Sequence, residues 1–256
     1  MIKTQGLVDS ARTNAWLGYW RALLQRPEMG FARLADASSD WTEISRRAEG
    51  LKAVQHLVVL GTGGSSLGTQ VIVQAIPARR SVEIDFLESP DPVLWARVRP
   101  KLSPSSHFLI VSKSGSTLET IVWIEKLATE GFLNARNSTF ITSPGNGPMH
   151  QWAEREQVAR LGIPADVGGR YSVLSAAGML PAAILGLEPE RFRVGAAWAL
   201  AHPEVAATMA EAAWESWARG EWITQLWSFS VGLHAFGEWW QQLWAESLAK
   251  KTARGG

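Results

Sequence analysis

Short apolar runs alternate with longer amphipathic segments from residue 56 to residue 163. Runs of apolar and β-branched residues are typical of buried strands in a parallel sheet. They lie at residues 56–60, 82–87, 108–111, 138–142 and 158–163. The segments between them have the length and periodicity of helices, at residues 69–76, 92–98, 121–131 and 149–157. This alternation predicts an α/β fold with a doubly wound parallel sheet, which binds ligands at the carboxyl ends of its strands.

The regions on either side of this alternation are predicted to be mostly helical. Large apolar residues recur at helical spacing in residues 8–50, and residues 172–220 are rich in alanine and leucine with the same periodicity. A strand at residues 222–228 and a helix at residues 233–250 then begin a second strand–helix array. The predicted division is a helical N-terminal arm at 1–50, a first α/β domain at 51–171, a helical connection at 172–220 and the start of a truncated second domain at 221–256.

Composition narrows the class of protein further. The 256 residues are 46% hydrophobic and 19% charged, with a net charge of +1, which is typical of a soluble globular protein and favours neither nucleic acid nor a membrane surface as partner. The absence of cysteine excludes disulfides and thiolate metal sites. The N-terminus lacks the apolar core of a signal peptide, and no run approaches the ~20 apolar residues that span a bilayer. A cytoplasmic protein is expected.

Tryptophan is unusually frequent, with 14 tryptophans beside 2 tyrosines. Eight of them follow residue 195: Trp198, Trp214, Trp217, Trp222, Trp227, Trp239, Trp240 and Trp244. Such a density of large apolar rings is consistent with a core, a subunit interface or a wall that stacks on sugars. The core is the favoured interpretation.

Residues 112–117 place hydroxyls around one cation and one glycine, directly after the strand predicted at 108–111. Ser116 and Glu119 have the spacing of a helix capping box. Free backbone N–H groups and the dipole of the following helix favour a phosphate at such a position. The alternative is an ordinary strand-to-helix turn with a capped helix.

The glycine-rich turn at residues 61–68 admits three interpretations. A nucleotide-binding P-loop requires a lysine after its last glycine, but Thr69 follows Gly68. A dinucleotide-binding turn requires a third glycine where Ser66 stands, although Glu88 has the spacing of its acidic residue. The third interpretation is a tight loop that contacts a sugar or its phosphate through backbone N–H groups and Ser65.

Two further stretches contain residues suited to catalysis. Arg170 follows two glycines and is either a surface ion-pair partner or a cation that stabilises developing negative charge. Glu238, Gln242 and Glu246 form one stripe of a tryptophan-rich helix. This stripe is either a solvated face or the location of a carboxylate that loses hydration beside indole rings and acts as a general base.

Four stretches together resemble the phosphoglucose isomerase (glucose-6-phosphate isomerase) family in its N-terminal portion. They are GTGGSSLG (61–68), SKSGSTLET (112–120), VGGRYSVLSAAG (167–178) and FGEWWQQLWAES (236–247). The resemblance implies a three-layer α/β/α sugar-isomerase (SIS) domain, followed by a helical segment and the start of a second SIS domain. It also implies glucose 6-phosphate and fructose 6-phosphate as substrates, no metal or other cofactor, and a homodimer for the full-length family.

The family's site residues carry over where the motifs match. The resemblance assigns the substrate phosphate to Ser112, Lys113, Ser114 and Thr117, and the sugar to Gly64, Ser65 and Gln242. It makes Arg170 the group that stabilises a cis-enediolate intermediate. It makes Glu246 the base that moves a proton between C2 and C1.

The chain also departs from the family pattern. Ser114 stands where many relatives have threonine, and Ala249 replaces a glycine after the base. The family's ring-opening histidine and its C-terminal lysine lie in segments that this sequence does not contain, and His234 is better explained as a local helix-face residue. The resemblance therefore implies an N-terminal fragment, or one piece of a split isomerase, with an incomplete site. The alternatives are a non-catalytic sugar-phosphate-binding SIS module and, third, a dinucleotide-binding domain.

Overall fold

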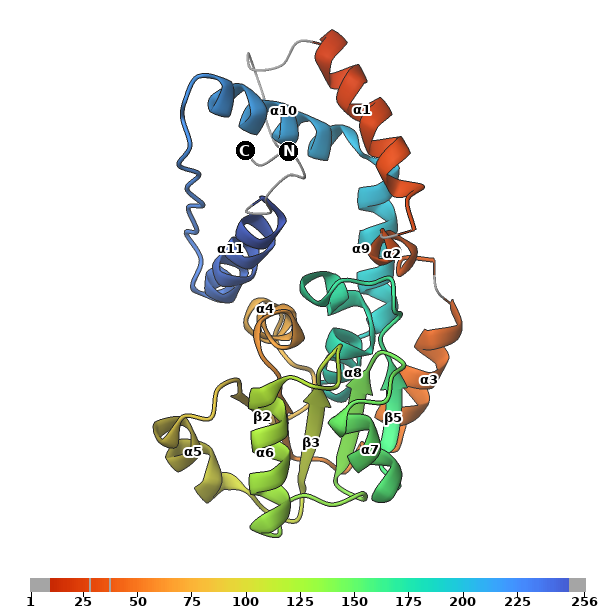
Figure 1. The fold of residues 1–256 in the computed structure, drawn as a ribbon, viewed down its shortest axis with the longest axis vertical. Coiled ribbons are helices and arrows are strands. Elements are labelled where there is room, and N and C mark those ends of the chain that lie inside the picture. Colours follow the sequence, from red (N-terminus) through yellow and green to blue (C-terminus); the bar gives the residue numbers. More distant parts are fainter. Residues whose placement is uncertain (1–9, 28, 37, 249–256) are drawn as a thin grey trace.

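The computed structural model describes residues 10–27, 29–36 and 38–248, and consists of an α/β/α sandwich with a helical extension (Figure 1). Its centre is a five-stranded parallel sheet with the strand order β2-β1-β3-β4-β5. The strands are β1 (His56–Leu60), β2 (Glu83–Leu87), β3 (Ser106–Val111), β4 (Ser138–Thr142) and β5 (Ala159–Gly162). The predicted doubly wound sheet is confirmed, with each strand within two residues of its expected bounds.

Helices cover both faces of the sheet and extend beyond it. Those on one face are α3 (Ser38–Glu49), α4 (Leu67–Ala75) and α8 (Ala176–Ile184), and those on the other are α5 (Pro92–Val98), α6 (Leu118–Thr129) and α7 (Pro148–Arg155). The remaining helices are α1 (Ser10–Leu24), α2 (Gly30–Arg33), α9 (Pro189–Ala201), α10 (Glu204–Ala218) and α11 (His234–Leu248). Short 3₁₀ turns lie at Gly63–Ser65, Arg99–Lys101, Gly169–Leu174 and Val231–Leu233.

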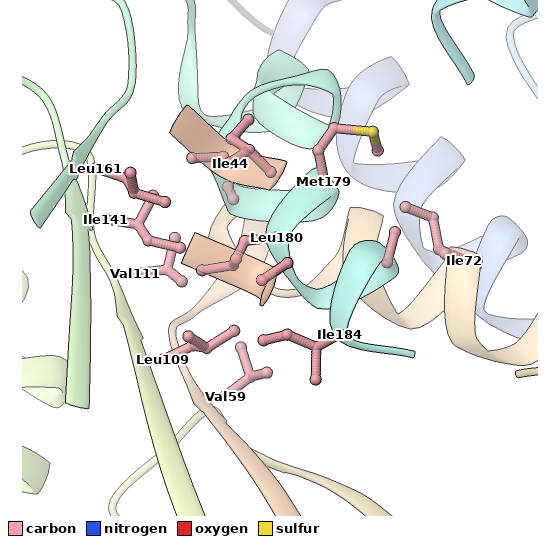
Figure 2. Close-up of a cluster of buried hydrophobic side chains, with 14 of the residues drawn as sticks. Ile44, Val59, Ile72, Leu109, Val111, Ile141, Leu161, Met179, Leu180 and Ile184 are labelled. Carbon is pink, nitrogen blue, oxygen red and sulfur yellow. The ribbon is translucent and has the colours of Figure 1, made fainter. Parts of the chain in front are cut away.

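Alternate residues of each central strand enter two separate hydrophobic cores. Val59 and Leu109 face α3, α4 and α8, where Ile44, Ile72 and Leu180 pack against them (Figure 2). Their chain neighbours point to the opposite core, beneath α5, α6 and α7. Because both faces are covered, the central strands β1 and β3 are largely apolar, whereas the edge strands β2 and β5 contain charged residues.

A polar chain ties α3 to the amino-terminal edge of the sheet. The Arg47 guanidinium donates to Thr139 Oγ1 at 2.9 Å from Nε, and Thr139 Oγ1 lies 2.9 Å from Nε2 of the buried His107. Since the Thr139 oxygen accepts from Arg47, its hydroxyl proton is free to point at His107 Nε2. Burial, with the nearby Arg47 charge, lowers the pKa of His107 to about 3. His107 is therefore a neutral structural residue.

The strand predicted at residues 222–228 is wrong. Residues 221–230 have no regular secondary structure and are all exposed, with Ile223 86% and Phe229 91% accessible to solvent. A strand requires a hydrogen-bonded neighbour, and none of the described strands lies beside this segment. The segment is apolar as expected, but it has no sheet to join. The end of the predicted helix at 249–250 and the tail at 251–256 lie outside the described residues.

The core interpretation of the late tryptophans is also wrong. Trp198, Trp214, Trp222 and Trp227 are exposed, and the other four are only half-buried. The physical reason is position: α9, α10 and α11 lie outside the sandwich layers, so their tryptophans do not reach its two hydrophobic cores (Figure 1).

Helix α11 is attached to the sandwich through α4 and through the turns at Gly63–Ser65 and Gly169–Leu174. The buried Ala235 marks this contact, and its backbone N–H donates to Gln74 Oε1 of α4 at 2.9 Å. Helix α10 instead packs on α1, away from the sheet (Figure 1). None of the helices in the described part of the chain is long and apolar enough to cross a membrane.

Candidate active site

The residues singled out in the sequence converge at the carboxyl edge of the sheet, between β1 and β3. The helices that follow these two adjacent strands, α4 and α6, cover opposite faces of the sheet. Such a switch point leaves a crevice in which doubly wound proteins bind ligands. Here the crevice holds a cavity of about 350 Å³. It is lined by Thr62, Gly64, Ser65, Lys113, Ser114, Thr117, Gly169, Arg170, Gln242 and Glu246.

The loop between β3 and α6, residues 112–117, supplies one wall of this cavity. Lys113, Ser114 and Thr117 reach the cavity, and α6 begins directly after them, so its N-terminal N–H groups face the same region. Ser112 is buried: its Oγ lies 2.8 Å from Thr117 Oγ1 and accepts from the Gly115 N–H at 3.1 Å. Ser112 therefore holds the shape of the loop from its buried side, while Lys113, Ser114 and Thr117 are available to a ligand.

The predicted capping box at Ser116 and Glu119 is wrong. Thr117 is the N-cap residue, and its carbonyl accepts the first helical hydrogen bond from the Ile121 N–H at 3.0 Å. The Ser116 hydroxyl donates to Ser114 Oγ at 3.1 Å instead. The helix therefore begins one residue later than the spacing implied, and the left-handed Gly115 (φ 66°) lies in the turn before it.

The loop that follows β4 packs against the 112–117 loop and supports it through backbone hydrogen bonds. The Ser143 N–H donates to Lys113 O at 3.2 Å, and the Met149 N–H donates to Gly115 O at 3.0 Å. The buried His150 donates through Nε2 to Ser143 O at 2.8 Å, and its ring lies directly under Gly115. A Cβ on Gly115 would lie 2.4 Å from His150 Cε1. Sequence reasoning missed His150, since nothing in its local pattern distinguishes it from a core histidine.

The glycine-rich turn packs backbone against backbone. A Cβ on Gly64 would lie 2.5 Å from the Gly169 carbonyl carbon, so glycine is required for the turn to meet the segment before Arg170. Ser66, also buried, donates to Glu88 Oε1. The Glu88 carboxylate is thus engaged by the turn itself, which argues against the ribose-binding role that a dinucleotide site would require.

Arg170 and Glu246 meet across the cavity although they lie on different elements. Arg170 Nη1 is 3.4 Å from Glu246 Oε2, and Gln242 Nε2 donates to Glu246 Oε1 at 2.9 Å. The Arg170 side chain is 17% exposed and that of Glu246 is 50% exposed. Of the two alternatives for this stripe, a carboxylate that loses hydration beside indole rings is therefore wrong for Glu246, because its carboxylate faces a guanidinium, an amide and open solvent. Arg170 forms its ion pair inside the cavity, not on an outer surface.

The stripe on α11 divides in two. Gln242 and Glu246 line the cavity, but Glu238 is exposed and lies 3.7 Å from His234 Nε2. His234 is thus a surface helix residue, as expected. Sequence reasoning missed Thr62 and Gly169 in the lining, and it missed the role of Ser247, whose Oγ accepts from Arg170 Nε at 3.2 Å.

Among the described residues, no group of three or more histidine, aspartate or glutamate side chains is close enough to hold a metal ion. The donors that line the cavity are hydroxyls, backbone N–H groups, the Gln242 amide and two cations, Lys113 and Arg170. This donor set suits an anionic, hydroxyl-rich ligand.

A doubly wound parallel sheet with a hydroxyl-rich loop at its switch point is the architecture of the SIS class of α/β domain. The chain belongs to the phosphoglucose isomerase family, whose sequence profile matches residues 33–256. It is 32% identical over 188 residues to a glucose-6-phosphate isomerase of Thermus thermophilus, covering 69% of this chain and 45% of that protein. It is 33% identical over 207 residues to that of Rubrobacter xylanophilus, covering 73% and 46%. The chain thus spans about half the length of the curated relatives it matches.

Solved structures agree on the fold. The crystal structure of a hypothetical protein from Thermus thermophilus superposes with a TM-score of 0.83 at 27% identity, over 96% of this chain and 61% of that chain. A glucose-6-phosphate isomerase from Chlamydia trachomatis superposes with a TM-score of 0.74 at 23% identity, over 97% and 59%. The SIS fold predicted from the four motifs is confirmed.

Proposed function

We propose that this chain carries the substrate site of an aldose–ketose isomerase that interconverts glucose 6-phosphate and fructose 6-phosphate. The observation that carries the proposal is the meeting of Arg170, Gln242 and Glu246 with the 112–117 loop around one cavity. A site for this reaction needs an anion anchor, a base and a cation beside the reacting oxygens. The cavity offers all three, and membership of the family supports the assignment.

The substrate phosphate is proposed to bind the 112–117 loop. Lys113 supplies charge, Ser114 and Thr117 supply hydroxyl donors, and the start of α6 supplies N–H groups and its dipole. Ser112 contributes by holding Thr117 in place. Binding energy at this remote end positions C1 and C2 of the sugar against the base.

Proton transfer is proposed to use Glu246. Its carboxylate removes the C2 proton and delivers it to C1 through a cis-enediolate, while the hydroxyl proton passes from O2 to O1 and Arg170 stabilises the negative charge that develops on the two oxygens. Gln242 donates to one carboxylate oxygen, which leaves the oxygen nearer Arg170 beside the substrate edge. Gly64 and Ser65 form the floor on which the sugar lies.

Several wider features belong to the same proposal. We infer a helical arm at 1–50, an SIS domain at 51–171, a helical connection at 172–220 and the beginning of a second SIS domain at 221–256. In this division α3 of the arm and α8 of the connection pack on the sheet and complete the SIS sandwich. We further infer a cytoplasmic location, a homodimer as the assembled form, and ring opening by a histidine outside this sequence.

Exchange of the C2 proton of glucose 6-phosphate into heavy water tests the proposed chemistry directly. We expect measurable exchange with the chain as it stands, and a loss of at least about 100-fold in Glu246→Gln, because a positioned base contributes about that much or more. Glu238→Gln is the matched control, since Glu238 lies on the same helix but is exposed outside the cavity.

Binding separates the alternatives. Sugar phosphates that raise the unfolding temperature without any C2 exchange would make the protein a non-catalytic SIS module. Stabilisation by nicotinamide or flavin cofactors, but not by sugar phosphates, would reject both the isomerase and the SIS-module interpretations in favour of a dinucleotide site.

A further inference from the structure

We propose that Tyr171 and Ser247 form a hydroxyl pair that positions Arg170 against Glu246, and that Phe31 of the N-terminal arm supports this pair. The inference rests on the proposed function, because it names residues that position the two groups assigned to catalysis. Neither hydroxyl lines the cavity, so both act through Arg170 and are positioning residues.

Ser247 is the point where three side chains meet. Its Oγ accepts from Arg170 Nε at 3.2 Å and lies 2.8 Å from the Tyr171 hydroxyl. Ser247 directly follows Glu246 on α11, whereas Tyr171 directly follows Arg170 in the turn at Gly169–Leu174. The hydroxyl pair therefore joins the two segments that carry the base and the cation, one residue away from each.

The Tyr171 ring provides a second constraint on the guanidinium. Arg170 Cζ lies 4.8 Å from the ring centroid, within the range of a cation–π contact. Ser247 fixes the position of Arg170 Nε, and the Tyr171 ring fixes the plane of the guanidinium. Together they leave one orientation of the guanidinium, with Nη1 toward Glu246. The side chain is thus fixed before any substrate binds.

This restraint has a chemical purpose. Arg170 Nη1 stands 3.4 Å from Glu246 Oε2, a loose contact for an ion pair, since charge-assisted N–H···O bonds are usually about 2.7–2.9 Å. An unrestrained guanidinium would close onto the carboxylate in a bidentate pair and occupy both of its oxygens. Holding Nε at Ser247 keeps the base accessible and the cation directed at the substrate oxygens.

The N-terminal arm reaches the same group of residues through α2. The Phe31 ring stacks on the Tyr171 ring with centroids 4.7 Å apart and planes at 22°. Next to it, Gly30 packs so closely on Asp166 that a Cβ would lie 2.4 Å from Asp166 Cγ, and Arg33 pairs with the Asp166 carboxylate. These contacts anchor α2 to the segment that leads to Arg170, so the arm contributes to the site although it lies outside it.

The test compares Ser247→Ala, Ser247→Thr, Tyr171→Phe and Phe31→Leu with the wild-type chain. We expect Ser247→Ala to lower the maximal C2 exchange rate about 10-fold and Tyr171→Phe about 3-fold, with the KM for glucose 6-phosphate unchanged within 2-fold, because the phosphate loop is untouched. Ser247→Thr keeps the hydroxyl and is expected to retain the wild-type rate. Tyr19→Phe is the matched control, since Tyr19 is the other tyrosine of the chain and lies exposed on α1.

A double variant and a ligand pair sharpen the result. Ser247→Ala combined with Tyr171→Phe is expected to be no slower than Ser247→Ala, since the two hydroxyls act as one unit. Arabinonohydroxamate 5-phosphate, a planar mimic of the enediolate edge, is expected to bind Ser247→Ala about 10-fold more weakly, and inorganic phosphate equally well. Multiplying effects in the double variant, or equal losses for both ligands, would overturn the inference.

The NMR signal of the Arg170 Nε–H keeps the two proposals separate. We expect a resolved signal with slow hydrogen exchange in the wild type, loss of that protection in Ser247→Ala, and partial loss in Phe31→Leu. If the wild type shows no C2 exchange, the proposed function fails, and the Nε–H signal still decides whether Tyr171 and Ser247 position Arg170. Unaltered Nε–H protection in Ser247→Ala would reject the positioning role outright.

Discussion

His107 shows how strongly one buried side chain links stability to pH. The unfolded chain takes up a proton on this histidine near pH 6.5, whereas the folded chain does so only near pH 3. Between these values unfolding is coupled to proton uptake, so the free energy of unfolding falls as the pH falls. Above pH 6.5 the residue is neutral in both states, so the free energy of unfolding no longer depends on the protonation of His107 and the stability lost at lower pH is fully present.

We predict a contribution from His107 of up to about 1.4 kcal/mol per pH unit between pH 6 and pH 4. Urea unfolding at several pH values should show a shallower pH dependence in His107→Gln than in the wild type. His234→Gln is the control, because that histidine is 77% exposed. Equal slopes in all three proteins would contradict the assignment.

Gly115 is predicted to be intolerant of any side chain. Its φ is 66°, and a Cβ would lie 2.4 Å from the His150 ring, so Gly115→Ala must distort the loop proposed to hold phosphate. We expect phosphate and sugar-phosphate affinity to fall at least about 10-fold by calorimetry, equivalent to about 1.4 kcal/mol. Gly195→Ala is the control: it has open space around it in α9 and should stabilise that helix by up to about 1 kcal/mol. Unchanged affinity in Gly115→Ala would refute this role.

Motif residues were predictable from sequence because their chemistry is local. Lys113, Ser114 and Thr117 form a recognisable group within six residues of chain, and the cavity includes all three. His150 and Ser247 were not predictable as site components, since each acquires its role only from a neighbour distant in sequence. A buried histidine and a helical serine carry no signal of that kind by themselves.

Helix α11 begins with a contact that its own sequence does not supply. The Ala235 N–H is one of the first four donors of the helix, and Gln74 of α4 accepts it. We predict that Gln74→Ala lowers stability by about 1 kcal/mol, the typical cost of a lost helix cap. Hydrogen exchange in the first turn of α11 should accelerate about 5-fold, the factor that such a free energy represents.

The exposed Gln241 provides the matched control for that experiment. Gln241 lies on α11 itself, and Gln241→Ala is expected to leave both the free energy of unfolding and hydrogen exchange in the first turn of α11 unchanged. If Gln74→Ala and Gln241→Ala behave alike, the contact with α4 does not hold the start of α11.

Elements of the sandwich follow from the sequence, whereas the partners of an element do not. The strands β1 and β3 were predictable because burial on both faces makes them largely apolar, and β4, which is also buried throughout, is rich in β-branched and aromatic residues. Residues 222–228 show the same apolar character without forming a strand, since pairing depends on a neighbouring chain segment. The capping box failed for a related reason: a four-residue spacing does not reveal where Gly115 ends the turn.

The molecule as a whole exposes a long apolar segment between α10 and α11. Ile223 and Phe229 are 86% and 91% exposed, and Trp222 and Trp227 lie exposed beside them. Such a contiguous surface promotes association. We predict that the pair Ile223→Lys and Phe229→Lys reduces concentration-dependent light scattering several-fold and changes the free energy of unfolding by less than about 0.5 kcal/mol.

A lysine elsewhere on the surface tests whether the segment itself is responsible. Val93 is also apolar and exposed, but it lies at the start of α5 on the sandwich. If Val93→Lys suppresses scattering as strongly as the pair does, added charge and not the 221–230 segment explains the effect.

Fold class was predictable at this scale, but the placement of the outer helices was not. Alternating strands and helices restrict the topology to a doubly wound sheet. The association of α1 with α10, and of α11 with α4, joins segments far apart in the chain. Helical periodicity identifies which face of each helix is apolar without naming its partner, and for this reason the late tryptophans were assigned to a core they do not enter.

The residues of the candidate site lie far apart in the sequence, and this separation sets the order in which they appear during synthesis. Once α8 has emerged, the sheet, both of its helical layers and the 112–117 loop are all present, but Glu246 has not yet been made. An incomplete nascent chain therefore already has the loop proposed to bind phosphate, but not the residue proposed as the base. A ligand that binds only folded chain at 100 times its dissociation constant stabilises it by about 2.7 kcal/mol. Under the proposed function, a sugar phosphate bound to this loop would thus stabilise the chain before Glu246 is made.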